Sequence, residues 1–202
     1  MKRTAILIAA LAGLLLAAQA QAQAPAKGYY LGLSYGTVWT DAGGVYTNTV
    51  NEDTSAGGKL YGGYMWSDNW GMELGVQSLG KYEIFFNGSK IADVKTTAVS
   101  VSSVYTQPLF DWGYHVNVRF GLAFTDARFN CASLCGVGSP LNVDTKKRGV
   151  SGTFGIGVGA KLTESLSMRV DYDHIGNVHH QVDVREYREG YDTFGVSLQL
   201  LF

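Results

Sequence analysis

Four charged side chains are the first candidates for chemistry in this 202-residue chain. Glu73, Arg119, Arg169 and Asp171 each stand on the small or polar face of a segment whose opposite face is apolar. Each lies a few residues from a short predicted turn, so the four could meet in one network, where opposite charges must pair because isolated buried charges are costly. If the segments enclose a lumen, two roles fit this lumenal charge network. It could be a structural plug, or a selective gate for ions or solutes.

Two other motifs suggest chemistry that their residues do not support. Gly155–Gly159 superficially looks like a nucleotide loop, but it lies inside a strand-like segment, opens no helix and carries no phosphate-binding lysine. His179 and His180, with Asp173 and Asp183, are metal-ligand types, yet adjacent histidines point to opposite sides of an extended chain. We therefore expect no metal and no cofactor, and interpret these side chains as solvated loop residues.

The elements that position these residues are strands with alternating faces. In the last twelve residues, Phe194, Val196 and Leu198 alternate with small or polar groups up to the end of the chain. Each alternating segment is close to the 9–11 residues of a tilted membrane strand, so one face is predicted to meet lipid and the other the lumen. The eight segments span 29–36, 60–66, 70–77, 98–105, 114–124, 154–160, 166–172 and 191–202.

The connections between these segments alternate in length. Turns are short after the second, fourth and sixth segments, whereas the other connections are long and polar, as in barrels that keep short turns in the periplasm. Trp66, Trp70 and Trp112 flank short turns and are predicted to form an aromatic girdle at the periplasmic interface. Asn87-Gly88 is typical of a hairpin turn that carries its two strands beyond the membrane.

The N-terminus predicts export. A positively charged start is followed by an apolar run, Ala5 to Ala18, that is shorter than the roughly 20 residues of a spanning helix. Three overlapping cleavage sites follow, after Ala20, Ala22 and Ala24. We predict a signal peptide over 1–22, with the cleavage site open among these three, and one barrel domain over 23–202.

Composition narrows the class further. No later run approaches the ~18 apolar residues of a membrane helix, which leaves a soluble exported domain or a barrel. The 26 glycines and only 3 prolines favour dense β structure with short turns. The 17 acidic residues outnumber the 16 basic ones even before Lys2 and Arg3 are removed with the signal, which argues against nucleic-acid binding.

Cys131 and Cys135 are the only cysteines, and both fall in the predicted long loop after the fifth segment. Export passes them through an oxidising compartment, so a disulfide between them is expected. Its loop is too short to stabilise the whole fold much. It would instead shape the exposed tip of the loop.

The chain resembles a known family at several places. Gly58–Tyr82 resembles the second and third strands of the OmpA-like β-barrel family, and Phe120–Arg128 resembles its fifth strand. The terminal Phe202 is similar to the signal that the barrel-assembly machinery reads. The resemblance implies an all-β, eight-stranded antiparallel up-and-down transmembrane β-barrel in the outer membrane of a Gram-negative cell. The peptidoglycan-binding domain of OmpA is not expected, because the chain stops at Phe202.

A second resemblance concerns catalysis. His174-Ile175-Gly176-Asn177 is similar to the His-x-Ser-Asn motif of the lipid A deacylase barrels, but Gly176 stands where the nucleophilic serine should be. Without a hydroxyl no acyl-enzyme can form there. We therefore expect no catalytic residues and no enzymatic activity.

These observations lead to a functional expectation. The protein is expected to be a monomeric outer-membrane barrel with a structural or surface-interaction role carried by four extracellular loops. Its expected partners are outer-membrane lipid and lipopolysaccharide, the barrel-assembly machinery and an unknown extracellular ligand or host surface. A narrow porin is the alternative, and a lipid-modifying enzyme comes third.

Overall fold

The computed structural model describes residues 27–42, 49–51, 54–86, 89–109, 113–131, 146–182 and 185–202. Almost all of them lie in strands, and none of the described residues forms a helix long and apolar enough to cross a membrane. The predicted signal peptide, Trp112 and Cys135 lie outside the described residues, so the expectations that concern them stay predictions. The strands are β1 (Gly28–Ala42), β2 (Thr49–Asn51), β3 (Thr54–Met65), β4 (Trp70–Phe86), β5 (Ser89–Leu109), β6 (Tyr114–Cys131), β7 (Lys146–Lys161), β8 (Leu166–Val182) and β9 (Arg185–Leu201).

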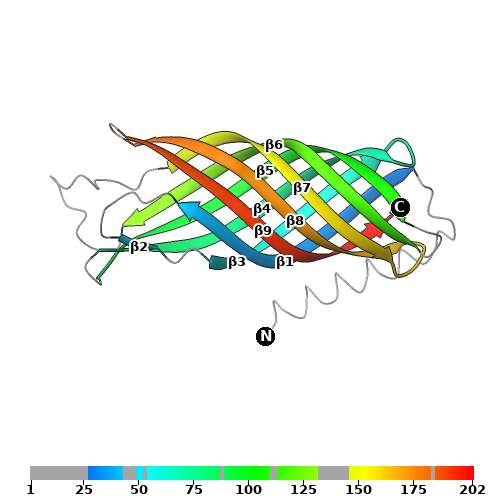
Figure 1. Ribbon diagram of the computed structural model, residues 1–202, viewed down its shortest axis with the longest axis horizontal. Coiled ribbons are helices and arrows are strands. Elements are labelled where there is room, and N and C mark those ends of the chain that lie inside the picture. The colour runs from blue at the N-terminus through cyan, green and yellow to red at the C-terminus, as the bar shows by residue number, and fades with distance from the viewer. Residues whose placement is uncertain are drawn as a thin grey trace, which may run out of the picture.

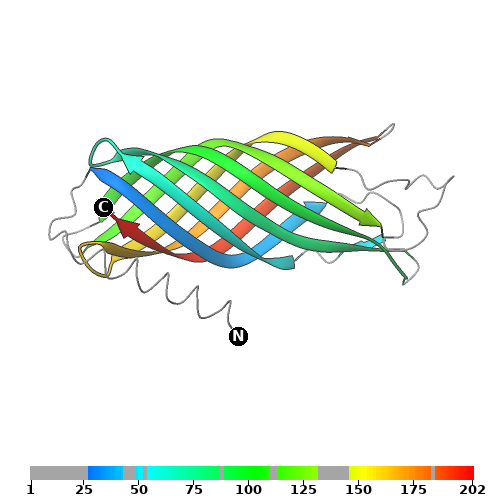
Figure 2. The same cartoon turned by 180° about the vertical axis from the view of Figure 1, so that it is seen from behind.

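Eight of these strands form a closed antiparallel barrel, as predicted (Figures 1 and 2). Each of them pairs with its neighbour in the chain, and β1 pairs with β9 to close the cylinder. The short strand β2 is an addition that the sequence did not predict. It pairs with Ile84–Phe86 of β4, beyond Ser78, where the pairing of β3 with β4 ends.

The two faces of the wall have opposite chemistry. Apolar side chains point outward and stay largely exposed, among them Leu33, Leu74 and Val150 at 56–60%. The inner face carries glycine, serine, asparagine and the charged residues, together with a buried apolar cluster of Val38, Leu79, Ala98, Ala123, Ile175 and Tyr191. An apolar surface that covers the wall of a cylinder is costly in water but suited to lipid. The predicted assignment of faces is therefore confirmed.

The short turns, the start of β1 and the end of β9 lie at the same end of the cylinder (Figure 1). Backbone hydrogen bonds close two of the turns, from Trp66 N to Trp70 O at 3.1 Å and from Thr163 N to Leu166 O at 3.0 Å. The amide of Phe202 donates to the carbonyl of Tyr29 at 2.9 Å, so the last residue extends the β1–β9 seam.

Aromatic side chains surround this end. Trp66 and Trp70 are exposed beside the first turn, as the girdle prediction requires. The ring centroids of Trp70 and Tyr105 lie 5.0 Å apart, and those of Tyr29 and Tyr64 lie 4.7 Å apart. The tyrosines were not assigned to the girdle from the sequence, although they occupy the same outward face beside the same end.

The other end differs from the prediction. The barrel strands run for 12 to 21 residues, longer than the 9–11 that cross a membrane. The connection after β8, expected to be a long loop, is only two residues long, because Val182 pairs with Arg185. Between β4 and β5, Phe86 pairs with Ser89, so these strands continue beyond the membrane to the hairpin that Asn87-Gly88 predicted. Strand pairing continues here because backbone ladder bonds need no apolar face in water. Asn87-Gly88 lies outside the described residues, at the position where its hairpin turn was predicted.

Labelling of single cysteines on intact cells tests which end faces outward. In a Cys131→Ser, Cys135→Ser background, Lys95→Cys and Arg128→Cys variants are expected to react with an impermeant maleimide. Asn69→Cys and Ser165→Cys variants, in the short turns, should react only after the outer membrane is broken. Reaction of either turn variant on intact cells would contradict this orientation.

Candidate functional site

The four charged residues predicted to form a lumenal network come together inside the barrel. Glu73 projects from β4, Arg119 from β6, and Arg169 and Asp171 from β8, and all four are at most 4% exposed. Arg119 Nη1 lies 2.8 Å from Asp171 Oδ1, and Arg169 Nε lies 2.8 Å from the same carboxylate. Arg169 Nη2 lies 3.7 Å from Glu73 Oε2, which links the three strands.

Two further residues complete the set. Lys59 of β3 places its Nζ 2.9 Å from Glu73 Oε1 and 3.4 Å from Asp173 Oδ2. Asp173 of β8 also accepts Arg119 Nη2 at 2.8 Å and Nε at 3.1 Å. The lumenal network therefore contains three cations and three carboxylates and is formally neutral: Lys59, Glu73, Arg119, Arg169, Asp171 and Asp173.

The sequence contained a signal for both of these residues. Lys59 is two positions before the inward Tyr61, and Asp173 is two positions after Asp171, so each shares an inner face with residues already assigned there. The interpretation of Asp173 as a solvated loop residue was wrong, because Asp173 is buried against Lys59 and Arg119. The described residues contain no cluster of three or more acidic, histidine or cysteine side chains that could hold a metal.

The glycine repeat of β7 provides the space for the carboxylates. A side chain at Gly155 would overlap Asp173 Oδ1, and one at Gly157 would overlap Asp171 Oδ1. These two glycines face the two β8 carboxylates across the β7–β8 ladder. The repeat in Gly155–Gly159 thus has a steric role in a strand, consistent with the rejection of a nucleotide loop.

Neutral groups add hydrogen bonds and a ring contact to the network. The Tyr30 hydroxyl donates to Glu73 Oε2 at 3.3 Å, and the Ser197 hydroxyl donates to Asp171 Oδ2 at 2.9 Å. Arg169 Cζ lies 4.7 Å from the centroid of the Tyr61 ring, in cation–π contact. Because the charges and the polar groups around them hold one another, the network is a cross-linked plug rather than a row of separate pairs.

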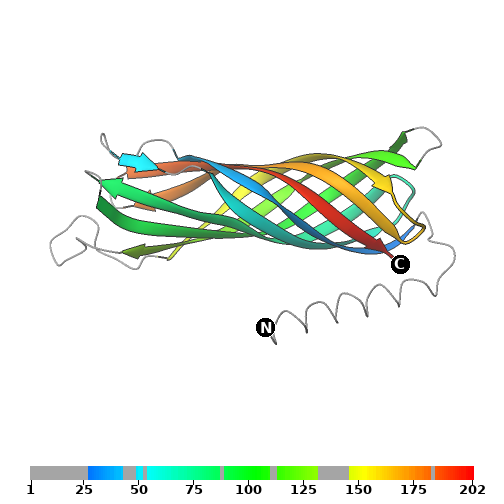
Figure 3. The same cartoon turned by 90° about the horizontal axis from the view of Figure 1, so that it is seen from below.

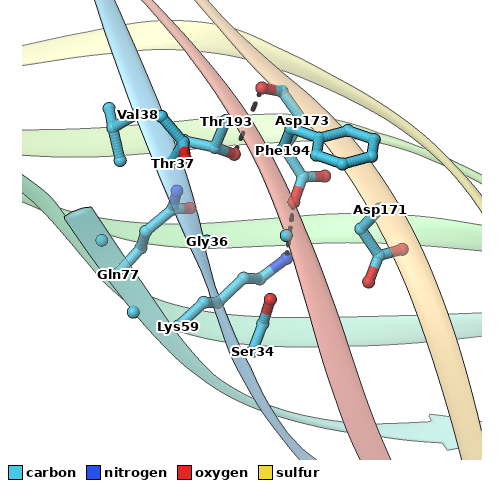
Figure 4. A pocket seen from close by; sticks show the side chains of 13 residues that line it. Ser34, Gly36, Thr37, Val38, Lys59, Gln77, Asp171, Asp173, Thr193 and Phe194 are labelled. Carbon is cyan, nitrogen blue, oxygen red and sulfur yellow. Dashed lines mark hydrogen bonds and ion pairs between the residues drawn. The ribbon is translucent and has the colours of Figure 1, made fainter. Parts of the chain in front are cut away.

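A small cavity adjoins the plug between β1, β3, β8 and β9 (Figure 4). Lys59 and Asp173 point toward each other beside it, and Gln77 approaches from β4. Its volume of ≈ 20 Å³ has room for about one water molecule. This space is far smaller than a solute path would need.

The segment that resembles a deacylase motif forms a polar cluster on the outer face. His174 Nδ1 lies 2.8 Å from Asp192 Oδ1, and the Tyr172 hydroxyl donates to the same oxygen at 2.6 Å. Gly176 offers no hydroxyl, and the nearby Ser151 is buried and donates to the Gly176 carbonyl at 2.6 Å. A histidine–carboxylate pair is therefore present at this place, and Gly176, the position of the motif's serine, supplies no nucleophile.

A double-mutant cycle measures the coupling energy between Glu73 and Lys59 in the plug. Glu73→Ala and Lys59→Ala should each lower the free energy of unfolding by about 3 kcal/mol, because each leaves buried charges unpaired. The double variant, which restores neutrality, should lose less than the sum. Urea unfolding of the barrel refolded in lipid vesicles is the measurement, with Gln77→Ala on the same inner face of β4 as the uncharged control, expected near 1 kcal/mol. Strict additivity of the two charge variants would show that the pair is not coupled.

Comparison with known proteins agrees with this architecture. The family model described as outer membrane protein beta-barrel domain matches residues 8–202, while no curated protein matches the chain. Neisserial surface protein A (NspA) is 13% identical, with a TM-score of 0.61 over 87% of this chain and 97% of that one. OprG of Pseudomonas aeruginosa is 14% identical, with a TM-score of 0.62 over the same shares. The N-terminal barrel of OprF from Pseudomonas aeruginosa, an OmpA-like barrel, is 14% identical, with a TM-score of 0.53 over 87% and 98%. The chain therefore belongs to the outer membrane protein β-barrel domain family and is a protein of the outer membrane.

Proposed function

We propose that this protein is a closed, non-enzymatic barrel that acts at the cell surface through the parts of its strands and connections outside the membrane. The observation that carries the proposal is the neutral plug in the lumen, in which three cations pair with three carboxylates. In this proposal the plug in the lumen stabilises the barrel. The barrel contacts other molecules through its outer end.

The energetics of the plug favour a structural role over a gate. Arg119 holds the carboxylates of Asp171 and Asp173 at 2.8 Å each. Lys59 contacts the carboxylates of Glu73 at 2.9 Å and of Asp173 at 3.4 Å. Moving either side chain aside leaves unpaired buried charges, at a cost of several kcal/mol. An eight-stranded cylinder is only wide enough for side chains to fill, so an opened gate has little space to occupy.

The length of the strands supports a role at the surface. β5 spans 21 residues and β4 spans 17, so both continue well past the 9–11 residues that the membrane requires. Their outer halves continue the β4–β5 ladder outside the membrane as a hairpin of mixed polar and apolar residues. One structural neighbour is called a surface protein, which fits the same location.

Features of the sequence and of the β1–β9 seam support a non-enzymatic, monomeric barrel. The absence of enzymatic activity is supported by Gly176, which replaces the hydroxyl that acyl transfer needs. Phe202 is proposed as the signal for the barrel-assembly machinery. The closed β1–β9 seam supports a monomer, because it leaves no open edge between these strands for a second copy to extend.

Conductance in planar bilayers separates the plug from a porin. The wild-type barrel is expected to show no discrete current steps, because its lumen is filled. A Glu73→Ser, Lys59→Ser variant, which empties part of the plug without net charge, should conduct, whereas Gln77→Ser should stay silent. Discrete steps in the wild type that this variant leaves unchanged would favour the narrow porin.

Shortening the outer hairpin tests the surface role. Replacing residues 83–93 by Asn-Gly joins Tyr82 to Val94, which already pair, through a two-residue turn. Cells that display the wild type should bind components of an array of matrix proteins and glycans, and the shortened barrel should lose those signals at equal surface level. Equal binding by both barrels, or none by either, would contradict a role for this hairpin.

A further inference from the structure

Across four neighbouring strands the outward face changes from apolar to basic within three rows. The last apolar row consists of residues that pair in register from β4 to β7, each 47–57% exposed. Its members are Val76, Val99, Phe124 and Val150. Inside a membrane this row faces lipid acyl chains.

The next two rows outward are polar and then cationic. Ser78, Thr97, Asp126 and Arg148 pair across the same four strands in the first of them. Lys81, Lys95, Arg128 and Lys146 pair across the strands in the second. We define the basic patch as the four exposed cations whose side chains are described: Lys81, Lys95, Arg128 and Arg148.

Counting along the strands puts the basic patch just outside the membrane. Lys95 lies 14 positions before Leu109, the last residue of β5, and Arg128 lies 14 positions after Tyr114, the first residue of β6. Both of these strand ends adjoin the short-turn end. Since a tilted strand crosses the hydrocarbon core in 9–11 residues, both cations reach the headgroup layer of the opposite leaflet.

Nearby carboxylates offset only part of this charge. Asp93 lies 3.2 Å from Lys81, and Asp126 lies 3.5 Å from Arg148 and 3.8 Å from Arg128. Like charges directly opposite on neighbouring strands destabilise a sheet, yet Lys95 stands opposite both Lys81 and Arg128. An anion that bridges these cations would remove the repulsion.

We infer that the basic patch binds the phosphate groups of lipopolysaccharide in the outer leaflet. This lipid places its phosphates above its acyl chains, and the barrel places Lys95 and Arg128 two rows above the apolar Val99 and Phe124. Lysine and arginine both bind phosphate, and arginine does so with two parallel hydrogen bonds. The inference depends on the outer-membrane location of the family and is independent of what the outer hairpin binds.

Binding of labelled lipopolysaccharide to the full barrel tests this site. The barrel is refolded in a neutral detergent with a metal chelator, and correct folding is checked by its heat-dependent gel position. A Lys95→Gln, Arg128→Gln variant should bind about 30-fold more weakly, at roughly a factor of five per cation. The matched control is Lys27→Gln, Lys161→Gln, which removes two exposed cations at the short-turn end and should bind like the wild type.

Further arms identify the group that is bound. Dephosphorylated lipid A should bind wild type and variant equally and weakly, and millimolar inorganic phosphate should not displace the labelled lipid. Displacement by inorganic phosphate would assign the patch to free anions and overturn the proposal. So would equal lipopolysaccharide affinity for the patch variant and its control.

The stability of the barrel against urea gives a second test. The variant that loses affinity for lipopolysaccharide is not expected to lose stability in neutral vesicles. In neutral phosphatidylcholine vesicles the patch variant should resist urea at least as well as the wild type, because charge repulsion has been removed. Added lipopolysaccharide should stabilise the wild type and the control variant but leave the patch variant unchanged. Equal stabilisation of all three would contradict the proposed site. If the double variant does not fold, Lys95→Gln alone should show a loss of about five-fold in affinity.

Discussion

Charges enclosed by the barrel must neutralise one another, because the wall that surrounds them faces lipid on its other side. The plug meets this constraint with Lys59, Glu73, Arg119, Arg169, Asp171 and Asp173, drawn from four strands. Each carboxylate contacts two cations, so no ion pair stands alone. The plug thereby ties together strands that are distant around the wall, in addition to the ladder bonds between neighbours.

Several other features of the barrel follow from this constraint. Carboxylates approach the β7 backbone at positions 155 and 157. Glycine is required there because any side chain would overlap Asp173 or Asp171. Tyr30 and Ser197 supply hydroxyl donors to oxygens of Glu73 and Asp171 that Arg169 also contacts. Small and polar residues on the inner face therefore reflect both crowding and the need to satisfy each buried charge.

Outside the membrane the same antiparallel ladder works under different rules. The β4–β5 and β8–β9 ladders continue here, and residues of mixed polarity stand opposite one another, such as Lys81 and Lys95, or Tyr82 and Val94. The boundary between the two regimes is visible in three successive rows, from Val99 through Thr97 to Lys95 on β5. The change from apolar to cationic residues over two rows matches the change from acyl chain to phosphate in the adjoining lipid. Figure 3 shows that the strands run obliquely to the long axis of the barrel.

The sequence alone determined the closed eight-stranded wall, its lipid and lumen faces and the short-turn end. The side chains of a strand alternate between its two faces, so a shift of one residue would move every apolar side chain from the lipid face to the lumen. It also identified Glu73, Arg119, Arg169 and Asp171 as inward charges. Only the tertiary structure decided which of them pair, added Lys59 and Asp173, and extended β8 and β9 beyond the membrane. Pairing depends on the register and tilt of strands far apart in the chain, and polar strands in water carry no hydrophobic alternation that would reveal them.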